Sequence, residues 1–317
     1  MNATGAAHSK LTVVGAGSVG SSLAFAALLR RSARTIALYD IQTKKVDAEV
    51  LDLAHGTQFT GSSEIIGGDD VAVAAGSDVV VITAGAKQEP GQTRLDLAAT
   101  NVGILKRMLP LLLEQAPDAT YIVVTNPCDV LTAVARSISG LPSNRVFGSG
   151  TSLDTSRLRW AIAARLGVST DSVHASVVGE HGDTELVLWS SAMVGSVPLL
   201  SWPCDSPLTQ KELGWIADDV RDAAYAVIEG KGATNYAIGV TAARLVEAVL
   251  DDEQAVLPVS TVLDDYYGIS GVALSVPSLV GARGATPLAE VAYAPDELRL
   301  LRASADTLLV SQRMLGF

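Results

Sequence analysis

His181 lies in the segment Gly179-Glu180-His181-Gly182-Asp183-Thr184, directly after an apolar stretch that is expected to be extended. The flanking glycines place its imidazole on a bend with little packing around it. An imidazole has an unperturbed pKa of about 6.5, so it can give and take a proton near neutral pH. A lone histidine of this kind is more often an ordinary loop residue, and a catalytic interpretation therefore needs partners.

Two candidate partners lie at the start of a predicted helix, in Leu153-Asp154-Thr155-Ser156-Arg157. Asp154 and Arg157 stand at positions i and i+3, so they share one helix face. A carboxylate can orient His181 and stabilise its cation, whereas a guanidinium can hold a substrate carboxylate through two parallel hydrogen bonds. Without His181, the same pair would be interpreted as a surface salt bridge.

A glycine-rich turn, Gly15-Ala16-Gly17-Ser18-Val19-Gly20, follows an apolar strand and opens a helical pattern. It precedes Asp40 by about 20 residues, as in dinucleotide-binding βαβ units. Here Gly15 permits the tight turn, Gly17 lets a diphosphate approach the backbone, and Gly20 lets helix and strand pack closely. Asp40 is expected to accept hydrogen bonds from ribose hydroxyls and to repel a 2′-phosphate, which favours NAD over NADP. The alternative is a glycine turn that binds no ligand.

The elements that must position these residues alternate along the first half of the chain. Apolar strands are expected at 11–14, 35–39, 64–66, 78–83 and 119–125, and helices at about 19–29, 44–54, 95–115 and 130–137. Continuously apolar strands separated by helices predict an α/β fold with a doubly wound parallel sheet of the Rossmann type.

The pattern changes after about residue 150, where strands follow one another and can pair antiparallel. Helices are expected at 153–166, 212–229, 234–250 and from 295 onward, and extended segments at 173–179, 185–189, 256–263 and 272–280. We therefore expect a Rossmann domain over 1–150 and an α+β substrate domain over 151–317. The segment at about 84–96 contains Gly85, Pro90 and Gly91, as expected of a lid.

Composition excludes several classes of partner. The chain has 317 residues, 48% of them hydrophobic, and a net charge of −11, so nucleic acid and anionic membranes are unfavourable partners. The apolar stretch at 11–29 is interrupted by glycines and serines, which argues against a membrane span. The polar start has no signal-peptide pattern, so a cytoplasmic location is expected.

Neither cysteines nor histidines form a metal-binding pattern. Cys128 and Cys204 are far apart, which fits a reducing compartment, although the sequence leaves a disulfide between them open. The histidines at positions 8, 55, 174 and 181 form no ligand cluster, so no metal is expected.

Six segments, in this order and at these separations, resemble the lactate/malate dehydrogenase family. They are GAGSVG, AGAKQEPGQTRLDL, VTNPCD, GSGTSLDTSRLR, GEHGDTE and KGAT, and the resemblance runs from about Lys10 to the C-terminal helix. It implies a Rossmann domain, a mixed α/β substrate domain, and hydride transfer between a nicotinamide and the carbonyl carbon of a 2-keto acid. It also implies that the chain forms a homotetramer.

The resemblance assigns roles to individual residues. His181 is the implied acid/base, Asp154 its partner, and Arg157 the anchor of the substrate carboxylate. Arg94, on the lid, is implied to polarise the substrate carbonyl. Negative charge develops on that carbonyl oxygen during reduction, so cationic His181 and Arg94 are both needed there. Substrate contacts are also expected at Gln88, Asn126 and Thr234. The expected cofactor contacts are Gly15, Gly17, Val19, Gly20, Asp40, Lys45, Ala84, Gly85, Val124, Thr125, Asn126 and Ser149.

Gln88 decides between two substrates within this family, since the malate branch carries arginine at that position. A neutral glutamine leaves the second carboxylate of oxaloacetate uncompensated in a closed site, so pyruvate and L-lactate are favoured over oxaloacetate and malate. Longer 2-keto acids remain possible side substrates. A non-catalytic NAD-binding sensor is a further alternative, but it would not need to retain His181, Arg94 and Arg157 together.

Arg159 lies two positions beyond Arg157 and points to another side of the helix. In bacterial lactate dehydrogenases, an arginine and a histidine at positions that match Arg159 and His174 bind fructose 1,6-bisphosphate at a subunit interface. The resemblance therefore implies activation by this bisphosphate. The alternative is an ordinary surface arginine and a half-buried histidine.

Overall fold

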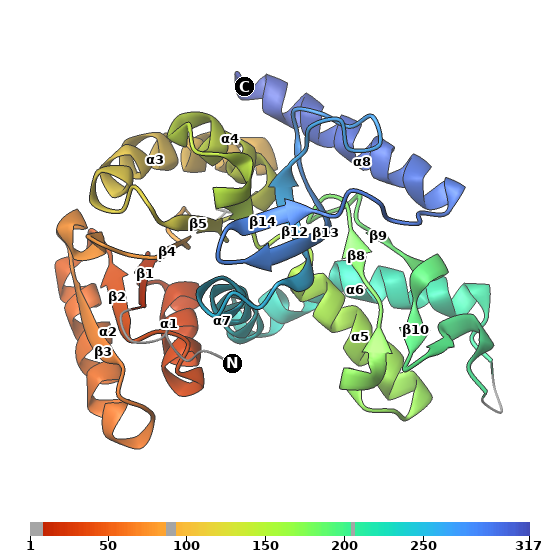
Figure 1. Ribbon diagram of the computed structural model, residues 1–317, viewed down its shortest axis with the longest axis horizontal. Helices are drawn as coiled ribbons and strands as arrows, with labels where there is room; N and C mark the ends of the chain where they lie inside the picture. Colours follow the sequence, from red (N-terminus) through yellow and green to blue (C-terminus); the bar gives the residue numbers. More distant parts are fainter. Residues whose placement is uncertain (1–8, 87–92, 204–206) are drawn as a thin grey trace.

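The computed structural model describes residues 9–86, 93–203 and 207–317 (Figure 1). Its first half forms a parallel sheet with the strand order β3-β2-β1-β4-β5-β6. These strands are β1 (Lys10–Val14), β2 (Thr35–Tyr39), β3 (Glu64–Gly68), β4 (Val79–Ile82), β5 (Thr120–Val123) and β6 (Val146–Gly148). This order is that of a doubly wound dinucleotide-binding sheet, and the predicted Rossmann fold is confirmed.

The helices lie close to their predicted positions. Those of the first half are α1 (Ser18–Arg30), α2 (Thr43–Gly56), α3 (Arg94–Gln115) and α4 (Cys128–Ser139). Those of the second half are α5 (Ser152–Leu166), α6 (Gln210–Lys231), α7 (Tyr236–Leu250) and α8 (Pro295–Met314). Strand β6 was not predicted, because it is short and runs directly into a glycine-rich segment. None of the helices in the described part is both long and apolar enough to cross a membrane.

Three strands of the second half extend the first sheet instead of forming one of their own. They are β12 (Ala255–Val262), β13 (Ala273–Gly281) and β14 (Gly284–Pro287), and they pair antiparallel with one another. Strand β12 joins the edge of β6 where Ser260 pairs with Gly148, which makes the sheet nine-stranded. The remaining strands, β7 (Val173–His174), β8 (Val177–Val178), β9 (Leu186–Val187), β10 (Met193–Val194) and β11 (Val197–Pro198), form two small sheets.

Helices from both halves of the chain cover the large sheet. One face carries a core built from α3, α4 and α8, and the opposite face carries a core built from α1, α2 and α7. A third, smaller core joins α5 and α6 to the short strands. Figure 1 shows α8 beside α4 and α7 beside α1. Because both large cores mix residues from the two halves, the second half is anchored to the nucleotide-binding sheet.

The contact between α1 and α7 is close because one residue in it lacks a side chain. A Cβ added to Gly239 would lie 2.8 Å from the backbone carbon of Ser22. Nearby, the guanidinium of Arg30 donates two hydrogen bonds to Glu247, at 2.7 and 2.6 Å, and Ser32 donates a third at 2.7 Å. The small residue sets the helix spacing and the ion pair fixes the rotation of one helix against the other.

We expect Gly239→Ala to destabilise the protein by about 1–3 kcal/mol, since the added methyl group must push α1 and α7 apart. Gly214→Ala is the matched control, because that helical glycine is exposed and nothing lies within 4 Å of its added Cβ. The control should be neutral or stabilising by up to about 1 kcal/mol. Denaturant unfolding of both variants checks this, and equal effects would contradict the close-packing argument.

Candidate active site

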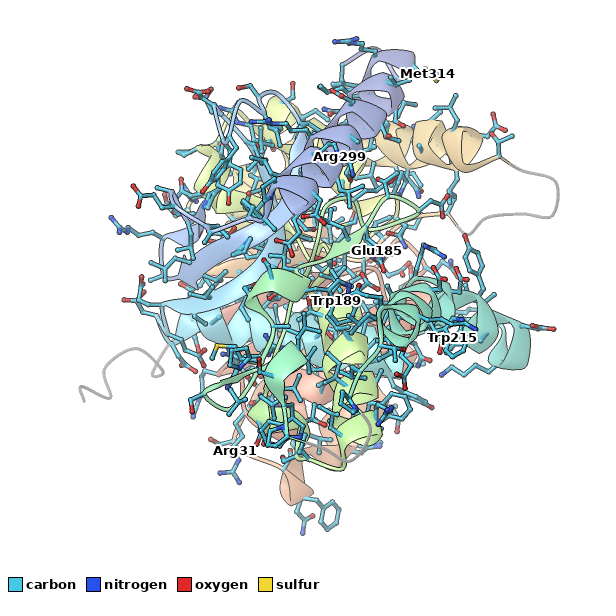
Figure 2. The ribbon with its side chains drawn as sticks, turned by 90° about the vertical axis from the view of Figure 1, so that its right-hand side faces the viewer. Arg31, Glu185, Trp189, Trp215, Arg299 and Met314 are labelled. Atoms are coloured by element: carbon cyan, nitrogen blue, oxygen red, sulfur yellow. The ribbon has the colours of Figure 1, made fainter. Side chains whose placement is uncertain are left out.

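A cavity of about 1070 Å³ opens at the carboxyl edge of the parallel sheet. The glycine turn, the loop after β5, the start of α5, the loop between β8 and β9, and parts of α6 and α8 line it. Figure 2 shows Glu185, one of the lining residues, between α8 and α6. The carboxyl edge is where ligands bind in doubly wound sheets, and most of the predicted site residues meet here.

His181, Asp154 and Arg157 come together in this cavity. Nδ1 of His181 lies 2.7 Å from Oδ2 of Asp154, and Nη1 of Arg157 donates to Oδ1 of Asp154 at 2.7 Å. The Asp154 side chain is 2% exposed, whereas those of His181 and Arg157 are 24% and 17% exposed. The buried carboxylate therefore holds both an imidazole and a guanidinium at the wall of the cavity.

Local sequence explains how the two segments meet. Asp154 stands in the first turn of α5, where the helix dipole favours a negative charge. The hydroxyl of Thr151 donates to the carbonyl of Val177 at 2.6 Å, and the amide of Val177 donates to the hydroxyl of Thr155 at 2.9 Å. These bonds tie the start of α5 to β8, and the chain continues from β8 directly to His181.

The proton affinity of His181 results from opposing effects. Burial lowers the pKa of its imidazole, but the charge and hydrogen bond of Asp154, together with the charges of Asp129 and Glu185, outweigh burial, and the pKa is raised to about 9. Burial alone would raise the pKa of Asp154, whereas the charges and hydrogen bonds of His181 and Arg157 bring the net pKa below its usual value. The pair therefore consists of a cationic imidazole and an ionised carboxylate at neutral pH.

Two further carboxyl groups near His181 were not singled out from the sequence. Asp129 accepts a hydrogen bond from the backbone amide of His181 at 2.7 Å and another from the hydroxyl of Ser260 at 2.6 Å. Glu185 lines the cavity, and its carboxylate lies within 4.8 Å of ligand atoms of Asp154 and His181. Asp129 is the last residue of the segment VTNPCD and Glu185 the last of GEHGDTE, so membership of these two segments was the available signal.

Each glycine of the turn at the start of α1 has a distinct environment. Gly15 has a φ of +100°, and an added Cβ would lie 2.7 Å from the amide nitrogen of Ala84. A Cβ at Gly20 would lie only 1.8 Å from the carbonyl oxygen of Gly15. Above Gly17, by contrast, the nearest atom to such a Cβ is Nζ of Lys45, at 4.0 Å. Gly15 and Gly20 thus serve packing, and Gly17 leaves open space.

The chemistry of this turn fits a dinucleotide. Helix α1 has no side-chain cap at its N-terminus, so its first amides are free to donate to a diphosphate. Asp40 accepts from the amides of Ala16 and Gln42, at 2.8 and 2.9 Å, which holds its carboxylate beside the turn. Lys45 supplies a cation near Gly17. The residues present therefore fit NAD.

The loops after β4 and β5 are tied to each other. Asn101 of α3 accepts from the amide of Ala86 at 2.7 Å and donates to the carbonyl of Asn126 at 2.8 Å. The hydroxyl of Thr125 donates to the carbonyl of Ala84 at 2.8 Å, and a Cβ at Gly85 would lie 2.4 Å from the Thr125 side chain. Asn101 is buried and was missed by sequence reasoning, because its partners lie on other elements.

Some of the predicted substrate residues line the cavity, whereas others lie partly or wholly outside the described residues. Asn126 and Thr234 line the cavity with His181 and Arg157, and so do the expected cofactor contacts Gly17, Val19, Gly20, Gly85, Val124, Thr125 and Ser149. Arg94 is the first residue of α3, directly after the Thr93 cap, but its side chain lies outside the described part. Gln88 lies outside the described residues altogether.

The predicted effector pair lies on adjoining elements, away from the cavity. Nε of Arg159, on α5, donates to the carbonyl of Ala175 at 3.0 Å, and Ala175 directly follows His174 on β7. Arg159 is half-buried and His174 is exposed. The structure thus places the Arg159 side chain beside the backbone of the residue that follows His174.

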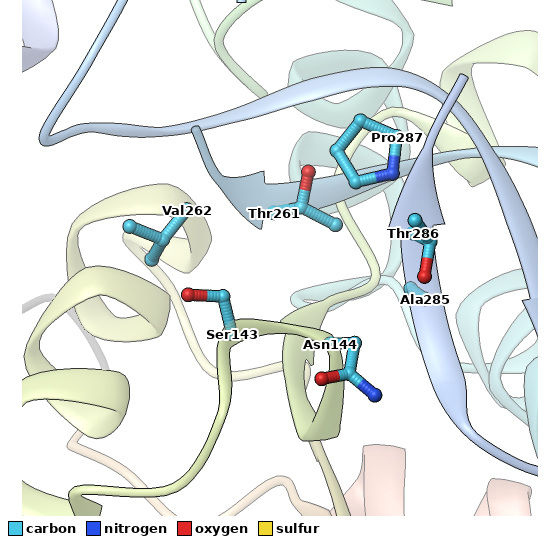
Figure 3. A pocket seen from close by; sticks show the side chains of 7 residues that line it. All are labelled: Ser143, Asn144, Thr261, Val262, Ala285, Thr286 and Pro287. Atoms are coloured by element: carbon cyan, nitrogen blue, oxygen red, sulfur yellow. The ribbon is translucent and has the colours of Figure 1, made fainter. Parts of the chain in front are cut away.

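A second, smaller pocket lies next to strands β12 and β14 and the segment before β6 (Figure 3). It has a volume of about 250 Å³ and is lined by Ser143, Asn144, Thr261, Val262, Ala285, Thr286 and Pro287. None of these side chains is titratable near neutral pH, so this pocket does not supply the chemistry expected of the first.

Comparison with known proteins agrees with this geometry. Residues 9–148 match the family model of the lactate/malate dehydrogenase NAD-binding domain, and residues 151–313 match that of the family's alpha/beta C-terminal domain. The chain belongs to the lactate/malate dehydrogenase family. It is accordingly an NAD-dependent oxidoreductase, and the expected cofactor is confirmed.

Relatives in this family are similar over nearly the whole chain. The chain is 48% identical to an L-lactate dehydrogenase of Bifidobacterium animalis subsp. lactis, over 97% of each sequence. It is 42% identical to an L-lactate dehydrogenase of Acetivibrio thermocellus, over 94% of this chain and 95% of that protein. A crystal structure of a minor L-lactate dehydrogenase from Enterococcus mundtii superimposes with a TM-score of 0.93 at 37% identity, covering 97% of this chain and 98% of that one.

The environments of Gly17 and Gly20 predict different outcomes for the same substitution. Gly17→Ala should leave the melting temperature unchanged, because the methyl group meets nothing closer than 4.0 Å, and should weaken NADH binding roughly tenfold or more by occupying the space for the diphosphate. Gly20→Ala should destabilise the fold itself. Calorimetric titration with NADH and thermal unfolding of both variants check this. Unweakened NADH binding in Gly17→Ala would contradict it.

Proposed function

We propose that this enzyme is an L-lactate dehydrogenase that reversibly reduces pyruvate with NADH. The observation that carries the proposal is the double role of Asp154, whose carboxylate bonds His181 through one oxygen and Arg157 through the other. A proton donor and a carboxylate-binding fork therefore face one cavity at a fixed separation. The named relatives, which are L-lactate dehydrogenases, support the same substrate.

The chain's own residues then divide the work. Arg157 keeps further guanidinium donors for the carboxylate of pyruvate, since Asp154 engages its Nη1. Cationic His181 donates its proton to the carbonyl oxygen as negative charge develops there, and takes it back in lactate oxidation. Asn126 and Thr234 contact the substrate from the cavity wall. Arg94 takes the role that the family resemblance implies for it, polarisation of the carbonyl. Bound NADH supplies the hydride.

Charge decides which 2-keto acid fits. The second carboxylate of oxaloacetate would need a cation of its own, and Gln88 on the lid is neutral. A methyl group in place of the second carboxylate needs no cation, which favours pyruvate over oxaloacetate.

Steady-state oxidation of NADH tests the proposal directly. We expect kcat/KM for pyruvate to exceed that for oxaloacetate, and His181→Gln to lower kcat by about two to four orders of magnitude through loss of the proton donor. The His181→Gln protein should still bind NADH, which serves as the control for folding. A kcat/KM for oxaloacetate equal to or above that for pyruvate would overturn the substrate assignment.

We also propose that the enzyme is a homotetramer activated by fructose 1,6-bisphosphate. The proximity of Arg159 to the residue after His174 supports a shared anion site, since cations from two subunits can hold one bisphosphate. Large exposed apolar side chains on α1, α5 and α7, among them Phe25, Trp160 and Tyr236, support burial against further subunits.

Fructose 1,6-bisphosphate should lower KM for pyruvate in the native protein, and His174→Gln should weaken this response without changing NADH binding. The effect is measured between about pH 5 and pH 8. Light scattering on the same samples determines the assembly. A pyruvate rate that ignores the bisphosphate throughout this range would refute the regulation, and a monomer would refute the assembly.

A further inference from the structure

Asp129 is a buried carboxyl group that contacts the backbone of the loop carrying His181. It is 3% exposed and stands in the first turn of α4, in the half of the chain that binds the nucleotide. Oδ2 accepts from the backbone amide of His181 at 2.7 Å, and Oδ1 accepts from the hydroxyl of Ser260 on β12 at 2.6 Å. One carboxylate thus joins α4, the His181 loop and the antiparallel extension of the sheet.

Three carboxyl groups raise the pKa of His181, and they come from different elements. They are Asp154 on α5, Asp129 on α4 and Glu185 in the histidine's own loop. Burial raises the pKa of Glu185 to about 8, assisted by the charge of Asp154, so Glu185 is mostly protonated at pH 7. Asp154 and Asp129 are then the negative charges that act on the imidazole at that pH.

The ionisation of Asp129 is itself finely balanced. Burial raises its pKa to about 6, against the hydrogen bonds from Ser260 and the His181 amide and the charge of His181, while Glu180 opposes ionisation. Asp129 is therefore mostly ionised at pH 7. It loses its charge on mild acidification, when one oxygen gains a proton and no longer accepts as strongly.

We propose that Asp129 is a positioning residue, which holds the backbone of His181 by a hydrogen bond and raises the proton affinity of its imidazole by charge. This inference builds on the proposed proton transfer by His181. Asp154 orients the ring through the side chain, and Asp129 fixes the loop through the main chain. Asp129 does not touch the substrate.

Asp129→Asn separates charge from geometry. The amide oxygen still accepts from the His181 amide, and the amide nitrogen can donate to Ser260, so the contacts are kept while the negative charge is lost. Selective ¹³C labelling of the histidine ring follows the titration of His181 in the protein without substrate. The chain has only four histidines, and His181→Gln assigns the signal.

The pKa of His181 should fall by about one unit in Asp129→Asn. The matched control, Cys128→Ser, changes a buried neighbour in the same helix without altering charge, and it should leave the pKa of His181 where it is. Asp154→Asn gives the scale, with a larger fall. An unchanged pKa of His181 in Asp129→Asn overturns the proposal, whatever the substrate of the enzyme proves to be.

Activity gives an independent readout. Pyruvate reduction needs protonated His181, so kcat/KM falls as pH rises through its pKa, and this alkaline fall should occur about one unit lower in Asp129→Asn. A uniformly lower rate with an unshifted pH profile would indicate a purely structural role and contradict the proposal.

If Asp129→Asn fails to fold, Ser260→Ala replaces it. That variant removes a donor that stabilises ionised Asp129, so the small inflection that Asp129 ionisation causes in the labelled His181 ring signal should move to higher pH, and an inflection that stays in place would contradict the proposal.

Discussion

The buried charge of Asp154 is the constraint around which the site is organised. A carboxylate that is almost wholly removed from water is unfavourable unless donors surround it, and here His181 and Arg157 both approach within 2.7 Å. The helix dipole at the start of α5 adds to their effect. Both donors can reach this one charge only if α5 and the loop after β8 keep their relative positions. This arrangement in turn fixes the cavity wall.

The relative positions of α5 and this loop depend on how the second half of the chain packs against the first. Strand β12 pairs with β6, and β13 contacts Gly179 at the end of β8 through Ser275. The hydroxyls of Ser304 on α8 and Thr184 share a hydrogen bond at 2.8 Å, and the Ser304 hydroxyl also accepts from the amide of Glu180 at 2.8 Å. The nucleotide-binding sheet, its antiparallel extension and the C-terminal helix thus fix the position of the His181 loop jointly. A separate substrate domain connected only by its chain would not do so.

Much of this site is visible in the sequence because its signals are local. The glycine turn needs particular backbone conformations within six residues, and Asp154 and Arg157 share a helix face through their spacing. The link of the α5 start to β8 is of intermediate range and was not predicted. Asp129 and Ser260 are 131 positions apart, and Asp129 and His181 are 52 apart, so no periodicity connects them. Asn101, which ties Ala86 to Asn126, was missed for the same reason.

The sequence by itself determined the fold class, the dinucleotide turn and the types of group that do chemistry, because backbone conformation and helix spacing are properties of neighbouring residues. Only the tertiary structure decided that the last three strands join the first sheet, that α7 and α8 cover its faces, and that His181 is held by carboxylates from two helices. Those outcomes depend on burial and on pairing between distant segments, where the pKa of a group is set by neighbours that the chain brings together only on folding.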